Sequence, residues 1–94
     1  MNKPKNTMKV SFPSRGANEG LARMLVAAFI TEADPTVEEL CDIKTAVSEA
    51  VTNCIVHAYP DRIGEIYIAA SLSESNLVTI KVRDHGCGIA DVQK

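Results

Sequence analysis

The residues of this chain best suited to chemistry lie four positions apart, at Glu49 and Asn53. On a helix this spacing aims both side chains the same way, about 6 Å apart along the axis. A carboxylate there can act as a general base, and an amide oxygen beside it suits Mg²⁺ when substrate phosphates supply other ligands. Further polar side chains extend the same stripe: Thr45, Ser48, Thr52 and His57. A solvated helix face would explain this stripe equally well.

A second candidate lies where an alternating segment, residues 78–84, meets a glycine-rich string. The two-residue period puts Asp84 on the apolar side of this segment, facing a core rather than water. A carboxylate in an apolar layer needs a partner, so Asp84 either meets an internal donor or awaits a ligand. Gly86 and Gly88 would let the backbone turn sharply and approach a flat ligand closely. By itself such a string is more often an ordinary turn than a binding loop.

Two shorter elements are expected ahead of the polar helix. Alternating apolar residues predict a strand over residues 8–12. Asn18 can cap the helix that follows, which ends near Asp34. Glu19 and Arg23 fall on the outer face of that helix, one turn apart. The residues expected to face the core are Leu21, Met24, Leu25, Ala28 and Phe29.

The polar stripe belongs to the longest predicted element, a helix that Pro60 ends. Thr36 followed by Glu39 is a capping-box pattern, although Asp34-Pro35 would start the helix almost as well. Its core side is expected to consist of Leu40, Ile43, Val47, Ala50, Val51, Cys54 and Ala58.

Residues 66–72 and 78–82 alternate as expected of an antiparallel hairpin with one wet face. The predicted fold class is therefore α+β. It is a two-layer α/β sandwich in which helices cover one face of a mostly antiparallel sheet. The 94 residues allow one small domain at most.

Composition excludes several classes of protein. Aromatic residues make up 4% of the chain and Trp is absent, which favours an aliphatic core over a stacking platform for single-stranded nucleic acid. A net charge of −2 argues against binding DNA or RNA directly. Since we find no membrane-length apolar run and no secretory leader, we expect a cytoplasmic protein without membrane contact. Three cysteines, Cys41, Cys54 and Cys87, are expected to be reduced and buried.

Two motifs carry a resemblance to a known family. Residues 48–59, SEAVTNCIVHAY, resemble the N box of the GHKL ATPase/kinase superfamily, and residues 84–89, DHGCGI, resemble its first glycine box. More narrowly, the chain resembles the anti-sigma F factor serine kinases from about residue 9 to residue 89. Cys54 stands where that family usually has Ala, and Ala58 where Gly is common. Neither departure removes a chemical group that the implied mechanism needs.

The resemblance implies a site for ATP and Mg²⁺. Glu49 would act as general base on the serine hydroxyl of a protein substrate, and Asn53 would be a ligand of the magnesium. Asp84 would accept a hydrogen bond from the adenine amino group. Gly86 and Gly88 would shape the loop beside the base. Phosphoryl transfer needs little beyond positioning, metal-neutralised phosphates and such a carboxylate, so these roles agree with the chemistry.

The resemblance also implies protein partners. Members of the family hold a sporulation sigma factor inactive and phosphorylate a STAS-type anti-anti-sigma protein, and they are expected to be homodimers. Glu19 and Arg23 match the surface of the first helix on which these partners dock. Judged from spacing alone, the same two residues are better explained as a plain i,i+4 ion pair.

Length leads to a further expectation. The chain stops before the lid, the second glycine box and the closing strands of a GHKL domain, so residues 1–94 are expected to form the N-terminal part only. We expect this part alone to bind ATP poorly and to transfer no phosphate. We also expect the strand over residues 78–84 to have an unpaired edge.

Three other interpretations stay open. The chain could be a module that binds ATP and sequesters a sigma factor without kinase activity. It could be the catalytic ATP-binding domain of a histidine kinase, although such an enzyme carries its phosphorylated His on an upstream helical segment. It could also be a plain α/β interaction domain.

Overall fold

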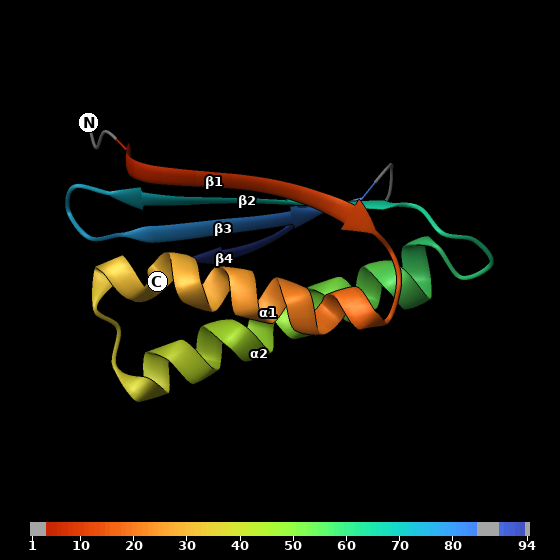
Figure 1. Ribbon diagram of the computed structural model, residues 1–94, viewed down its shortest axis with the longest axis horizontal. Helices are drawn as coiled ribbons and strands as arrows, with labels where there is room; N and C mark the ends of the chain where they lie inside the picture. Colours follow the sequence, from red (N-terminus) through yellow and green to blue (C-terminus); the bar gives the residue numbers. More distant parts are fainter. Residues whose placement is uncertain (1–3, 85–88, 94) are drawn as a thin grey trace.

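Two α-helices lie against one face of a four-stranded antiparallel sheet (Figure 1). The computed structural model describes residues 4–84 together with the backbone of residues 89–93. Its elements are β1 Pro4–Pro13, α1 Ala17–Ile30, the 3₁₀-helix η1 Thr31–Ala33, α2 Val37–Asn53, the π-helix η2 Cys54–Ala58, β2 Glu65–Ser73, β3 Val78–Arg83 and β4 Ile89–Gln93. This arrangement confirms the predicted α+β sandwich with helices on one face.

The sheet runs in the order β1-β2-β3-β4, and every neighbouring pair is antiparallel. Val10 lies opposite Ile68, which in turn lies opposite Val82, so apolar side chains form continuous rows toward the helices. The predicted hairpin is confirmed. The expected free edge of β3 is wrong, because β4 pairs along it from Arg83↔Ile89 to Thr79↔Gln93.

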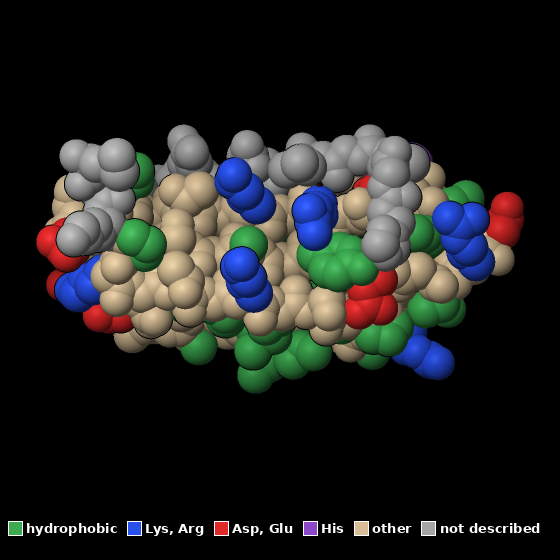
Figure 2. Space-filling view, turned by 90° about the horizontal axis from the view of Figure 1, so that it is seen from above, with side chains coloured by type: hydrophobic (Ala, Val, Ile, Leu, Met, Phe, Trp, Pro, Cys, Tyr) green, Lys and Arg blue, Asp and Glu red, His purple; other side chains and the backbone are tan. Residues whose placement is uncertain are grey.

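The uncovered face of the sheet is polar and basic. Figure 2 looks onto this face and shows Lys and Arg side chains spread across it. Lys81 and Arg83 of β3 are exposed there, and the Arg83 guanidinium lies 5.1 Å from the ring centre of Tyr67 on β2. This confirms the wet face predicted for the hairpin.

The core lies between the sheet and the helices, but α1 faces it differently from the prediction. Its fully buried residues are Ala22, Val26 and Ile30. Leu21 is 44% exposed, Met24 is 72% exposed and Ala28 is also exposed, so these three predicted core positions are wrong. Leu25 is half-buried, and Phe29 packs against the core as predicted. Residues 21–30 are apolar almost all round the helix, and periodicity alone therefore could not select the buried side.

The two helices begin in different ways. Gly16 occupies the N-cap of α1 without a side-chain hydrogen bond, so the prediction that Asn18 caps this helix is wrong. The Asn18 amide instead donates to the carbonyl of Pro13 at 2.8 Å and holds the turn between β1 and α1. Thr36 and Glu39 form a complete capping box at the start of α2, with bonds of 2.9 and 3.0 Å, as predicted.

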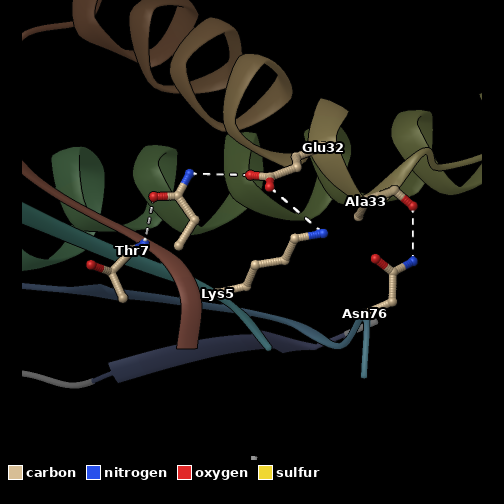
Figure 3. Close-up of polar contacts among 6 residues, drawn as sticks. Lys5, Thr7, Glu32, Ala33 and Asn76 are labelled. Atoms are coloured by element: carbon tan, nitrogen blue, oxygen red, sulfur yellow. Dashed lines mark hydrogen bonds and ion pairs between the residues drawn. The ribbon is translucent and has the colours of Figure 1, made fainter. Parts of the chain in front are cut away.

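Polar contacts secure η1 to the sheet (Figure 3). Glu32 pairs with Lys5 of β1 at 3.7 Å and accepts a bond from the Asn6 amide at 3.4 Å. Asn76, at a φ of 69° in the turn between β2 and β3, donates to the carbonyl of Ala33 at 2.9 Å. These exposed contacts fix the connection from which α2 starts.

The predicted core side of α2 is confirmed at its centre, where Ile43, Val47, Ala50 and Val51 are buried. After Asn53 the α-helix continues as the π-helix η2. Its hydrogen bonds span five residues, as in the bond of 3.1 Å that the N–H of Tyr59 donates to the carbonyl of Cys54. The wider turn brings Tyr59 into the core, where it is 4% exposed. Within residues 4–84 and 89–93, no helix is both long and apolar enough to cross a membrane.

Candidate functional site

The exposed side of α2 carries the predicted acid and amide. Glu49 and Asn53 are both exposed, one turn apart, near the C-terminal end of the helix. Buried neighbours on the opposite side of the helix fix this orientation, since Val47 and Val51 pack in the core. Two accessible oxygen-bearing groups at this spacing fit a hydrated Mg²⁺ that takes few protein ligands. The fit rests on the donor chemistry and the exposure of both groups.

The end of β3 meets the last turn of the same helix. Asp84 is half-buried, and its Oδ2 accepts a hydrogen bond from the Cys54 thiol with an Sγ–O distance of 3.6 Å. Asp84 therefore faces the helices, as the strand period predicts, and an internal donor contacts it. Cys54 directly follows Asn53, so this contact places the strand end beside the turn that carries the amide.

The environment of Cys54 keeps its thiol protonated. Burial is the main cause that raises the pKa of Cys54 to about 11, and the charge of Asp84 and its hydrogen bond add to the effect. At neutral pH the thiol is therefore a hydrogen-bond donor to the carboxylate rather than a nucleophile. Cys54 is in the core, as predicted, but its contact with Asp84 was not predicted. A sign of this contact in the sequence was the predicted position of Cys54 on the core side of the helix, directly after Asn53.

The predicted partner-binding residues lie between the helices rather than on an isolated outer face. Arg23 Nε lies 2.6 Å from Glu19 Oε2, which confirms the i,i+4 ion pair. The same Glu19 oxygen accepts a hydrogen bond from Ser48 Oγ on α2. Glu19 thus joins α1 to the residue that precedes Glu49, a contact that the sequence analysis did not predict.

A shallow cavity of about 260 Å³ lies between α1 and α2. Its lining residues are Arg23, Cys41, Lys44, Thr45, Ser48 and Glu49. The cavity therefore brings together the predicted base, the predicted docking arginine and a second cation. Cys41 is exposed here, so the prediction that it is buried is wrong, while Cys54 is buried as predicted. Both are free thiols.

The remaining predicted positions are less informative. Gly86, Gly88 and Cys87 lie outside the residues that the structure describes. His57 is exposed in the last turn of the π-helix η2. The structure thus brings Asp84 to the end of α2 and brings Arg23 to Glu49, while the roles of these groups stay predictions.

The α+β fold, with two helices on one face of an antiparallel sheet, is consistent with a GHKL-like ATPase domain. Residues 12–94 match the family described as "Histidine kinase-like ATPase domain", and the chain belongs to that family.

Curated relatives are more specific. The chain is 55% identical over 89 residues to the anti-sigma F factor of Thermoanaerobacter pseudethanolicus and 56% identical over 89 residues to that of Caldanaerobacter subterraneus. It is 52% identical over 90 residues to the anti-sigma F factor of Clostridium novyi. Each match covers 95% of this chain and 62% of the relative, so the chain spans somewhat under two thirds of their length.

Proposed function

We propose that this chain is the nucleotide-binding part of an anti-sigma factor that is also a serine/threonine protein kinase. It binds and inhibits a sporulation sigma factor and uses Mg-ATP to phosphorylate a serine of a STAS-type anti-anti-sigma protein. The observation that carries the proposal is the exposed Glu49–Asn53 pair on α2, beside the strand end that bears Asp84. Membership of an ATPase family and the identity to anti-sigma F factors support it.

Each residue has a distinct role in this proposal. Asp84 accepts a hydrogen bond from the adenine amino group, and Gly86 and Gly88 shape the loop beside the base. Asn53 offers its carbonyl oxygen to the Mg²⁺ that accompanies the triphosphate. Glu49 takes the proton from the serine hydroxyl of the acceptor as that oxygen attacks the terminal phosphorus.

Glu49 fits the role of base on physical grounds. Its carboxylate is exposed, so an acceptor hydroxyl can reach it. It also lines the cavity that Arg23 and Lys44 share, where an acceptor protein that docks on α1 would lie. We place the docking contact at Glu19 and Arg23, and the working protein in the cytoplasm as a homodimer. Neither DNA, RNA nor a membrane takes part.

The second candidate is a module that binds ATP and sequesters a sigma factor without transferring phosphate. The relatives are named for their anti-sigma role, and that name is compatible with either function. The two candidates differ in one property, which is transfer of labelled phosphate to a STAS-type protein.

Glu49→Gln in the full-length protein tests the assignment. The substitution keeps size and polarity but removes the base, so we expect transfer to fall by about 100-fold or more while affinity for ATP is kept. Glu74→Gln is a matched control, because Glu74 is exposed in the turn between β2 and β3. Unchanged transfer in Glu49→Gln would refute Glu49 as the base. Absence of transfer in the wild type would favour the sequestering module.

A further inference from the structure

One carboxylate oxygen of Glu19 on α1 contacts two other side chains, Arg23 on the same helix and Ser48 on α2. Oε2 accepts the hydrogen bond from Ser48 Oγ and lies 2.6 Å from Arg23 Nε. Ser48 and Glu49 are consecutive, and both line the interhelical cavity with Arg23. A single carboxylate therefore connects the docking arginine on α1 with the turn of α2 that carries the base.

The two bonds to Glu19 differ in what they can do. The ion pair with Arg23 lies within α1 and is partly exposed, so it contributes little to holding the helices together. The bond from Ser48 crosses between helices, ends on a charged acceptor and is partly buried. Charge-assisted bonds of this kind are stronger than neutral ones and fix geometry more tightly.

The position of Ser48 decides what that bond fixes. Successive residues on a helix are rotated by about 100° around its axis, so anchoring Ser48 sets the direction in which Glu49 leaves the same turn. A misplacement of the base by about 1 Å is enough to lower the rate of transfer by about 100-fold.

We propose that Ser48 is a positioning residue: through Glu19 it fixes the separation between the docking pair on α1 and the catalytic carboxylate of Glu49. The inference rests on the proposed kinase function and adds a residue to it. An acceptor protein seated on Arg23 then presents its serine to a carboxylate whose place is already set. In this scheme Ser48 affects the transfer through its bond to Glu19 and takes no part in the chemical step.

Ser48→Ala in the full-length protein tests the proposal. At saturating STAS-type acceptor we expect kcat to fall about tenfold, from the loss of one charge-assisted hydrogen bond in the positioned state. The KM for ATP and the affinity for sigma factor should stay within about twofold, because the substitution leaves the nucleotide and docking groups in place. Ser48→Thr keeps the hydroxyl and should retain most of the kcat. Ser71→Ala is the matched control, since Ser71 is a half-buried serine of β2.

Glu19→Gln provides the second arm and serves if Ser48→Ala fails to fold. It keeps the side-chain shape but weakens the bond to Ser48, so we expect a similar loss of kcat at saturating acceptor. At saturating acceptor, where weaker docking through Glu19 and Arg23 does not limit the rate, the double variant should lose little more kcat than either single variant, because both remove or weaken the same Ser48–Glu19 bond. A wild-type kcat in Ser48→Ala, or additive losses of kcat in the double variant, would overturn this inference and leave the proposed kinase function standing. No transfer by the wild-type protein would remove the proposed function, and the inference with it.

Discussion

Gly64→Ala should destabilise the fold at the point where the site-bearing helix joins the sheet. A Cβ added at Gly64 would lie 2.1 Å from Cε1 of Tyr59 and 2.4 Å from Cδ1 and Cζ of the same ring. These distances are far below van der Waals contact, so the ring or the backbone has to move. Tyr59 directly follows the π-helix that starts after Asn53, and the damage therefore falls close to the proposed metal ligand.

The ring has no easy way to move. Tyr59 is 4% exposed, its hydroxyl donates to the carbonyl of Glu65 at 2.8 Å, and its N–H bonds Cys54. The Gly64 backbone is held as well, because its N–H donates to Ser14 Oγ at 2.9 Å and its carbonyl accepts from the Ser14 N–H at 2.8 Å. Overpacking strain together with one weakened hydrogen bond gives a loss of about 2–4 kcal/mol in unfolding free energy.

Urea unfolding of the full-length protein, followed by far-UV circular dichroism, measures this loss. Gly16→Ala is the control of similar chemistry, because no atom of the described residues lies within 4 Å of a Cβ at that position. Gly20→Ala should instead stabilise by up to about 1 kcal/mol, since Gly20 lies inside α1 and its nearest contact is Arg23 Nη2 at an ordinary 3.6 Å. If Gly64→Ala unfolds with the same free energy as Gly16→Ala, the packing argument around Tyr59 is refuted.

Three further predictions concern the site. Asp84→Asn should weaken ATP binding by about tenfold to 100-fold, because it replaces a charged acceptor for the adenine amine with a neutral one. Titration with a fluorescent ATP analogue measures this, and unchanged affinity would contradict the assignment. Arg23→Glu should impair capture of the sigma factor in a pull-down while ATP binding is spared. Lys81→Glu is the charge-reversal control, because Lys81 is exposed on the uncovered face of the sheet. Equal capture of the sigma factor by both variants would contradict the docking role of Arg23. The thiol of Cys54 has a pKa raised from 9.0 to about 11 in the folded protein, so its contribution to stability is present below pH 9 and is lost as pH rises through 11. The stability of the wild type relative to Cys54→Ala should therefore fall by about 2 kcal/mol over that interval in urea unfolding, and a constant difference would show that the thiol does not titrate as described.

Much of the fold could be predicted from the sequence because its signals are local. The alternation in β2 and β3, the Thr36–Glu39 capping box and the buried side of α2 depend on residues within a few positions of one another. The same local logic placed Glu49 and Asn53 on one exposed side of α2 and pointed Asp84 toward the helices.

Long-range packing decided the rest. α1 is apolar almost all round, so only its docking against the sheet selected Ala22, Val26 and Ile30 as the buried line. The Cys54–Asp84 and Ser48–Glu19 bonds join residues 30 and 29 positions apart, and no local pattern encodes such pairings. Local sequence patterns thus predicted most of the elements and the chemical groups that each of them carries. Tertiary structure determined which elements meet, because contacts between distant segments depend on how whole faces pack together.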